Sequence, residues 1–490
     1  MNFLKDFWRR FPALHVGLSL TLGTAAALGL TWELIFPTLL LSLRYNLALR
    51  ATILALIAFS YTSWQYPQTH FQEKKLEGIA TFHIENLKIQ PSPFHKSYLY
   101  KGKITKFISE ETTLYHLPCS IYIPFKKNRP QADHDYQIKG TLVRTGNYHY
   151  VLKPNKKEPW LPLQNQLNLT EWRFRAKESV KNFLKKEIPD TKSAAFLTAL
   201  ATGNIDERSL ALEFNKLGIQ HILAISGFHF ALIAAFLSFF FKWFLSPKNA
   251  AILLLCVLSA YFLFIGNAPS VLRAWIAISL FLISQIFRLQ ISGLNALGVA
   301  LSAEILCDPL LATSMGFQLS FLATLAILLI YPLMNKLTYH LLPRRPLETV
   351  TMMNKLHQHL YLVGAALRHC LSLNIAVHLT TIPVILFLFH KFPLLSLGYN
   401  LFFPLGASIA LLLLVTSLLF NLIFPPLGHL LHKLNSTFTA TLLKSTEHPP
   451  SLLNFTLHLP AFPLIILIAF LTLLFYIGIY AESRREQTIC

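Results

Sequence analysis

Long apolar runs, separated by one polar stretch, are the feature that most constrains this chain. Runs of membrane-spanning length occupy residues 11–64 and 219–481, whereas residues 66–170 contain only short apolar segments. A helix needs about 20 predominantly apolar residues to cross roughly 30 Å of hydrocarbon. Only 13% of the 490 residues are charged, against roughly 25% in soluble domains. The sequence therefore excludes a soluble enzyme, a disordered tail and a disulfide-stapled module, and it predicts a polytopic α-helical membrane protein with a polar insertion.

The N-terminal block predicts the orientation of the chain. It contains three apolar runs, at residues 12–30, 34–43 and 51–64. Basic side chains precede the first run and follow the second: Lys5, Arg9, Arg10, Arg44 and Arg50. Basic residues in short loops tend to stay on the cytoplasmic side. Three crossings that start inside would therefore place residues 66–170 outside the cytoplasmic membrane.

The polar insertion has the pattern of a small β-domain. Aromatic and β-branched residues alternate with polar ones, and turn residues separate the runs. We predict five strands, at residues 79–89, 98–108, 113–125, 137–144 and 148–152, with hairpin turns at residues 110–112 and 146–147. Five short strands favour an extracytoplasmic oligonucleotide-binding (OB)-like β-barrel. A generic β-sandwich is the alternative.

The insertion is also basic and rich in aromatic residues. Proteins that bind single strands combine a positive groove with stacking rings, and each stacked base contributes roughly 1–3 kcal/mol. The candidates for direct DNA contact are Lys101, Lys103, Lys126, Lys127, Arg129, Tyr122 and Tyr148. Aromatic residues in strands are also ordinary core residues, and lysines form an ordinary solvated face. The composition alone leaves both interpretations open.

Residues 171–218 predict a connection made of helices. Residues 171–188 form a basic amphipathic helix, of the kind that most often lies in the membrane interface. Two shorter helices follow, ending at Gly203 and Gly218. Asp190 or Thr191 is placed to cap the first of them, and Asp206 the second.

The remaining sequence, residues 219–490, is dominated by predicted membrane helices. Candidate spans lie near residues 221–244, 249–265, 271–288, 293–307, 313–333, 371–390, 395–420 and 461–480. The apolar stretch at 425–434 is ambiguous. Polar residues within membrane segments are costly and tend to face a cavity or a partner helix. Those in this region are therefore candidates for function.

The most unusual polar cluster is His221, Ser226, Gly227 and His229, at the mouth of an apolar helix. Along an unbroken helix the two histidines would lie about 12 Å apart, which is too far to chelate one ion. Ser226 and His229 would share one face. A helix crossing with satisfied histidines is the alternative. An intramembrane hydrolase is a further alternative, with Ser226 as its nucleophile. Such a serine would need a base and an oxyanion hole, and no carboxylate that could orient His229 lies close in sequence.

Other polar residues interrupt later spans. Arg273 lies at the start of one of them. Its side chain either extends to the membrane interface or turns inward to bind phosphate. Asp308 precedes a proline and is expected to cap or break a helix. Gln318 and Ser320 add polar groups to another span, and Asn400 lies near Pro404 in a segment that suggests a broken helix. No Walker A loop, metal-ligand motif or cofactor site is predicted.

In their order, these residues resemble the ComEC-type competence family, the inner-membrane DNA-uptake channels of naturally transformable bacteria. Residues 221–229, HILAISGFH, are similar to the family signature HLLAISGLH. Further motifs with a family counterpart are Arg273-Ala274, Asp308-Pro309, the segment GFQLSFLA at 316–323, and Asn400 with Pro404. The resemblance covers most of the chain. It implies that single-stranded DNA crosses the membrane here after the complementary strand is degraded.

The resemblance also implies partners and a division of the chain. Many members carry a C-terminal metallo-β-lactamase-like domain, whose HxHxDH motif does not occur here. We therefore expect a short form of the family that acts as a channel and not as an enzyme. It is expected to work with a DNA receptor, a separate nuclease and a cytoplasmic motor or DNA-binding protein. The expected parts are transmembrane segments (1–65), the OB-like domain (66–170), connecting helices (171–218) and the channel domain (219–490). Homo-oligomerisation stays open, and a secondary transporter of a small anion or other solute is the alternative.

The predicted lining of the channel combines the polar residues of the membrane domain. These are His221, Ser226, Gly227, His229, Arg273, Asp308, Gln318, Ser320 and Asn400.

Overall fold

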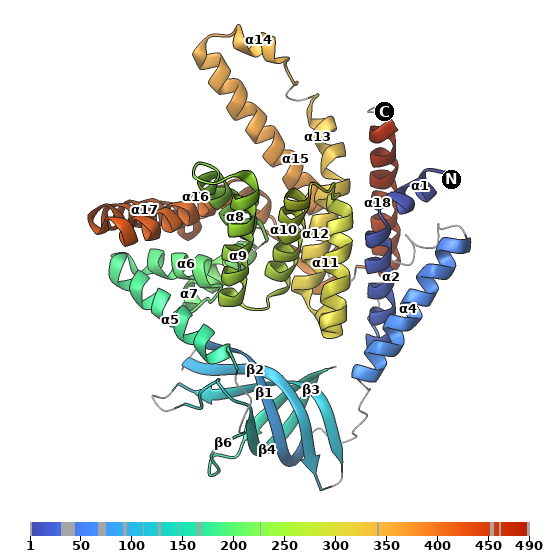
Figure 1. Cartoon of the computed structure of the whole chain (residues 1–490), viewed down its shortest axis with the longest axis vertical. Coiled ribbons are helices and arrows are strands. Elements are labelled where there is room, and N and C mark those ends of the chain that lie inside the picture. The colour runs from blue at the N-terminus through green and yellow to red at the C-terminus, as the bar shows by residue number, and fades with distance from the viewer. Residues whose placement is uncertain are drawn as a thin grey trace.

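The computed structural model consists of a β-barrel attached to a larger body of helices (Figure 1). It describes residues 2–30, 45–66, 75–91, 96–110, 112–125, 129–146, 148–163, 168–225, 227–340, 343–450, 455–459 and 462–487. Several sequence predictions lie outside these residues: the run at 34–43, the turn residue Asn147, and the candidates Lys126, Lys127 and Ser226.

The barrel contains all five predicted strands. They are β1 (Lys75–Pro91), β2 (Lys96–Ser109), β3 (Thr113–Pro124), β4 (Tyr136–Gly146) and β5 (His149–Pro154), and a short β6 (Leu161–Pro162) pairs with β4. The strand order is β1-β2-β3-β5-β4, and pairing of β1 with β4 closes the barrel. All pairs are antiparallel except β3 with β5. The closed five-stranded barrel confirms the OB-like prediction.

Curvature of the long first strand makes this closure feasible. Strand β1 pairs with β4 through its first half and with β2 through most of its length, with register shifts at Thr81/Phe82 and Ile84/Asn86. Such bulges bend a strand and increase its twist. Gly102 of β2 permits a close approach, because a Cβ there would lie 1.9 Å from the His83 carbonyl oxygen. The alternate residues of β1 and β2 then point inward and form the apolar barrel core.

Helix α5 (Thr170–Glu187) connects the barrel to the helical body (Figure 1). Its Phe174 packs into the barrel core, and its Leu184 packs into a cluster with the following helices. The apolar stripe of this basic amphipathic helix, expected to lie in the membrane interface, is turned largely toward protein: Phe174 and Leu184 are buried, Val180 and Phe183 are half-buried, and Trp172 stays exposed.

The two short connecting helices are α6 (Thr191–Thr202) and α7 (Arg208–Lys216). Asp190 caps α6 as expected, accepting a 2.8 Å hydrogen bond from the Ser193 amide. Asp206 does not cap α7. Its carboxylate instead pairs with Lys181 of α5 at 2.6 Å, so it ties the connection to α5.

The helical body confirms the prediction of a polytopic membrane protein. Its helices are α1 (Asn2–Arg10), α2 (Pro12–Leu28), α4 (Tyr45–Gln65), α8 (Gly227–Phe241), α9 (Pro247–Ile265), α10 (Pro269–Phe287), α11 (Gly293–Cys307), α12 (Met315–Leu329), α13 (Tyr331–Thr338), α14 (Leu347–Thr351), α15 (Lys355–Phe389), α16 (Leu395–Ile423), α17 (Pro425–Glu447) and α18 (Leu464–Gln487). Within the described ranges, seven helical segments are long and apolar enough to cross a membrane, or up to nine if each of two bent pairs is one span.

Small residues allow close contacts where helices of this body cross. Gly298 of α11 lies against the backbone of Ala13 in α2, and Gly23 lies against Ala55 of α4. Such contacts favour association of helices in lipid, where no hydrophobic driving force acts between them.

Helix α17 settles the ambiguous stretch at 425–434. It is a 23-residue helix that packs on α16, and its buried face is polar. The amide of Asn435, which is fully buried, donates to the Ala410 carbonyl of α16 at 3.0 Å. At the end opposite the barrel, α14 and the first turns of α15 project beyond the body (Figure 1).

Candidate functional site

The polar residues of the strongest sequence motif lie at a break between helices. Residues Gln220–Ile222 form a 3-10 turn, and α8 begins only at Gly227. The predicted span at 221–244 is confirmed as an apolar segment, Gln220–Phe241, but its first residues do not continue the α-helix. Because of the break, the wide separation expected along a continuous helix does not apply, and the rings of His221 and His229 lie close enough to interact electrostatically.

His221 is the centre of a group of polar side chains from several helices. Its side chain is exposed, although it also lies near His378 of α15. The amide nitrogen of Asn400 in α16 lies 3.5 Å from Nε2 of His378 and continues the group. In the part of the chain that the structure describes, Nδ1 of His378 and Oδ1 of Asn400 have no hydrogen-bond partner. Unsatisfied polar atoms between apolar helices favour a route for water or a polar substrate.

Arg273 is buried beside the start of α8. It lies near the start of α10, its side chain is 9% exposed, and its guanidinium lies 5.2 Å from the ring centre of Phe321 in α12. Its Nη2 would lie 3.3 Å from a Cβ on Gly227, so the glycine leaves room for the guanidinium. A snorkelling arginine would expose its head group. The position is instead that of the inward-facing arginine.

Glu304 and His378 are polar residues of this region that the sequence motifs do not single out. Glu304 is fully buried in α11 and near enough to Arg273 for electrostatic attraction. Among the described residues, neither of its carboxylate oxygens has a hydrogen-bond partner. Both residues lie inside predicted apolar spans. A titratable residue inside such a span is by itself a signal of function, independent of any motif.

Gln318 and Ser320 lie on α12, next to the contacts of Arg273. Gln318 is 7% exposed, and its Nε2 donates to the Ala312 carbonyl at 2.7 Å, which holds α12 to the turn before it. Ser320 is half-buried. Gln318 therefore has a structural bond, and a lining role for these two residues stays a prediction.

Asp308 joins three parts of the protein. Its carboxylate accepts a 3.0 Å hydrogen bond from the Tyr66 hydroxyl at the end of the N-terminal block, and it lies 3.6 Å from Nζ of Lys103 in barrel strand β2. It also accepts from the Leu310 amide at 3.2 Å and so caps the following turn, as expected. Burial and the Asp308 carboxylate both raise the pKa of the Tyr66 phenol, which therefore stays protonated and donates. Asp308 thus positions the barrel on the body.

The outer face of the barrel carries two of the predicted DNA contacts. Lys101 is exposed on β2, and Tyr122 is 48% exposed on β3, diagonally across from it in the strand register. This face of β2 and β3 is where OB-folds bind oligonucleotides. Lys88 of β1 lies next to Lys101, and burial together with the Lys101 charge lowers the pKa of Lys88.

These lysines continue into a basic junction where the barrel, α5 and α9 meet. Arg173 and Lys177 of α5 donate to the last carbonyls of α9, from Nε to Leu263 at 2.9 Å and from Nζ to Ile265 at 2.7 Å. Cations at a helix C-terminus are stabilised by the helix dipole. Burial, followed by the Arg173 and Lys88 charges, lowers the pKa of Lys177 to about 8. The clustered charges attract a polyanion. The sequence indicated Arg173 and Lys177 only as part of the basic face of an amphipathic helix, and not their bonds to α9.

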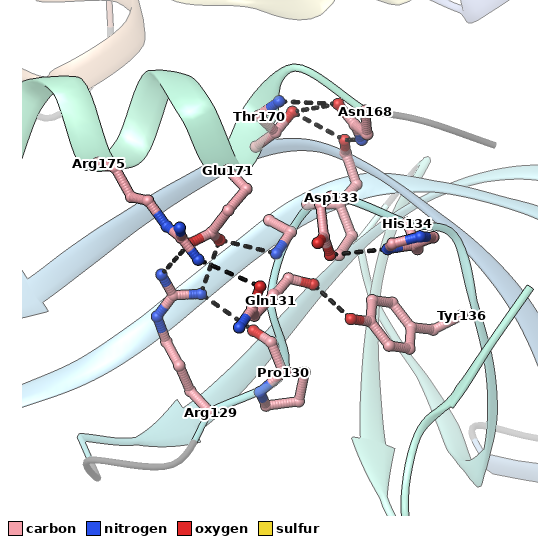
Figure 2. Close-up of polar contacts among 12 residues, drawn as sticks. Arg129, Pro130, Gln131, Asp133, His134, Tyr136, Asn168, Thr170, Glu171 and Arg175 are labelled. Atoms are coloured by element: carbon pink, nitrogen blue, oxygen red, sulfur yellow. Dashed lines mark hydrogen bonds and ion pairs between the residues drawn. The ribbon is translucent and has the colours of Figure 1, made fainter.

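Arg129 has a different role from the expected DNA contact. Its guanidinium makes two hydrogen bonds to Glu171 of α5, at 2.9 and 3.0 Å (Figure 2). It also lies 4.5 Å from the ring centre of Phe174. Glu171 also accepts from the Ala132 amide and from Arg175, both at 2.8 Å. Burial alone would raise the pKa of Glu171, but these donors outweigh it and hold the pKa below its usual range. Arg129 therefore fixes α5 to the barrel.

Tyr148 also lies away from the open face of the barrel. It is half-buried in the β4–β5 turn, with a left-handed backbone (φ 57°), and it packs against the apolar cluster of the helical body. Such packing suits an anchor of the barrel better than a stacking platform.

The clasp between Arg129 and Glu171 yields a stability prediction. Glu171→Gln leaves a buried guanidinium without its counter-charge, a change that costs about 3–5 kcal/mol in buried pairs. We expect a clear fall in the melting temperature of the full-length protein in detergent. Arg175→Gln removes an exposed partner of the same carboxylate and should cost at most about 1 kcal/mol. Equal effects of the two changes would contradict the clasp.

The junction at Asp308 yields a second prediction. Asp308→Asn removes the charge that attracts Lys103 and should increase hydrogen exchange in β2 and in the turn after Asp308. Tyr66→Phe keeps that charge and should have a smaller effect. In a double-mutant cycle, Asp308→Asn and Lys103→Gln should be less than additive. Full additivity would show that the two side chains act independently.

The described residues contain no group of three or more histidine, cysteine, aspartate or glutamate side chains that could hold a metal ion.

Comparisons with known proteins place this chain in a family. The sequence model of the family described as Competence protein matches residues 201–484, which include the motif break, Arg273, Asp308 and Asn400. A relative, "ComE operon protein 3" of Bacillus subtilis (strain 168), is 26% identical over 212 residues. That match covers 43% of this chain and 24% of the relative, so the chain spans only part of the relative's length. No solved structure matches. Because the family match covers more than half of its residues, the chain belongs to the Competence protein family.

Proposed function

We propose that this protein passes single-stranded DNA across the bacterial inner membrane into the cytoplasm during natural transformation. The observation that carries the proposal is a set of polar side chains in the apolar body: His378 and Asn400, which lie together and have atoms without partners among the described residues, and Arg273, which is buried beside the start of α8. Burying such groups without partners is costly, and a hydrated transport path provides a reason for them. Family membership supports the same conclusion.

The barrel supplies the capture step of the proposed mechanism. Lys101 and Tyr122 offer a charge and a ring on one exposed face, as sequence-independent single-strand binders do. Each phosphate that is neutralised releases counterions, so capture depends on salt. The basic junction of Lys88, Arg173 and Lys177 then lies between this face and the helical body. Its positive potential favours movement of the strand from the barrel toward the body.

The proposed setting follows from the sequence. The barrel would lie outside the cytoplasmic membrane, where a DNA receptor and a separate nuclease would deliver one strand. A cytoplasmic motor or DNA-binding protein would draw the strand in. The protein itself would act as a channel and not as an enzyme. A secondary transporter of a small anion is the competing function, because the buried Arg273 suits a free anion as well as a phosphodiester.

Binding by the barrel face gives one test. Labelled oligothymidylate is titrated into the full-length protein in detergent at about 50 and about 200 mM salt. Tyr122→Ala should cost roughly 1–3 kcal/mol of binding free energy, and Lys101→Gln should reduce the salt slope by about 0.7. Lys139→Gln, which removes an exposed lysine paired with Glu158 at 3.1 Å, is the matched control. Equal affinities of all variants would reject capture by this face.

Transformation in cells gives the test of the channel. Arg273→Gln and His229→Ala should each reduce DNA uptake strongly while the protein keeps its abundance in the membrane. Arg288→Gln removes an exposed arginine at the other end of α10 and should leave uptake unchanged. Normal uptake in the Arg273 and His229 variants would overturn their role in transport.

A further inference from the structure

We propose that Arg273 and the first turn of α8 form a phosphate-binding site inside the helical body, with Glu304 as a built-in competing charge. The inference rests on the proposed function, since it assigns the chemistry of one point on the proposed path. The ligand is a phosphate oxygen, either of a DNA backbone or of a free anion.

The amino-terminal ends of two helices meet at this site. Gly227 is the first residue of α8, and a Cβ on it would lie 3.4 Å from the Ser270 carbonyl oxygen in the first turn of α10. The Ser270 hydroxyl donates to the Ile225 carbonyl at 2.9 Å and holds the two ends together. The first amides of an α-helix lack partners within the helix, and the dipole makes that end positive. Helix amino termini of this kind bind phosphate groups.

Arg273 provides the second, independent element. The residue is only 9% exposed, and its Nη2 is directed at the start of α8, as the 3.3 Å distance to a Gly227 Cβ shows. Nη1 has no hydrogen-bond partner among the described residues. A buried cation with a free donor beside a positive helix end is costly. A phosphate would accept from the guanidinium and offset both positive charges.

The absence of a side chain at position 227 also suits such a site. A glycine at the start of a helix lets an anion approach the backbone closely, as in other phosphate-binding loops. The ring of Phe321 lies under the guanidinium and restricts its movement, so the planar fork is held in place for binding.

Glu304 explains how binding can stay weak enough for transport. It is fully buried and attracts Arg273, yet the two side chains form no ion pair within 4.0 Å in the described part of the chain. The carboxylate therefore offsets the positive charge without occupying the guanidinium. An arriving phosphate is attracted by Arg273 and the helix end and repelled by Glu304. Conduction requires this balance, because a strand held too tightly at one point does not move on.

The test measures phosphate binding directly. Purified full-length protein in an uncharged detergent is heated at constant ionic strength while phosphate replaces chloride. Phosphate should raise the melting temperature of the unchanged protein. Arg273→Gln should abolish this response, and Arg273→Lys should weaken it because the two-pronged donor is lost. Glu304→Gln should lower the half-saturating phosphate concentration several-fold, and Arg288→Gln should behave like the unchanged protein.

Two further arms keep the outcome decisive. If Arg273→Gln does not fold, Gly227→Ala replaces it, because the added Cβ would press on Nη2 and should weaken phosphate binding. An unchanged phosphate response in Arg273→Lys and Gly227→Ala, or a weaker response in Glu304→Gln, would overturn the site.

The source of the phosphate is distinguished with an abasic oligodeoxynucleotide, which carries phosphodiesters without bases. Competition between this strand and phosphate supports a site on the DNA path. Phosphate binding combined with normal transformation of the Arg273→Gln strain would keep the site but reject the proposed channel. Lost transformation without any phosphate response would keep the channel and reject the site.

Discussion

Hydrocarbon offers no hydrogen bonds, and this constraint governs how the protein arranges its polar groups. Each polar side chain in the helical body must find a partner, reach water or serve a ligand. Asn435 and Gln318 follow the first course, since each donates to a carbonyl of a neighbouring element. Arg273 and Glu304 do not, and they lie within electrostatic reach of each other. Polar side chains with hydrogen-bond partners in the protein therefore have a structural role, whereas those without such partners are candidates for contact with a substrate.

The joint between the barrel and the body is also built from directed polar contacts. Charged residues here are not scattered on a solvated surface but are directed to specific acceptors. Arg173 and Lys177 bond to the open end of α9, Lys103 lies beside Asp308, and Arg129 binds Glu171. Attachment at separate points limits rotation of the barrel. A DNA strand bound on the outer face of the barrel would therefore meet the helical body at a defined place.

The sequence predicted the local patterns of this fold well and its long-range pairs poorly. Alternation of polar and apolar residues found all five strands, because a strand buried on one face must repeat with a period of two. It could not find the partner of Arg129, which lies 42 residues away in α5. It assigned Asp206 to a cap because the spacing suited one, whereas the stronger partner was Lys181 of another helix.

The candidate site was predicted in the same uneven way. The ordered motifs alone were enough to single out His221, Arg273 and Asn400. Apolar periodicity joined residues 221–229 into one helix, because a short break leaves no mark on the composition. Glu304 was also missed, because a single carboxylate barely changes the mean hydropathy of a run of apolar residues. Only the packing of α10 against α11 reveals that it lies within electrostatic reach of Arg273.

The length of α15 has a mechanical consequence. At 1.5 Å per residue its 35 residues extend about 52 Å, well beyond the roughly 30 Å of acyl chains. The usual range of tilt, up to about 40°, does not absorb the excess. Several turns of α15 therefore exceed the length needed to cross the acyl chains, and its first turns project from the body at the end away from the barrel (Figure 1).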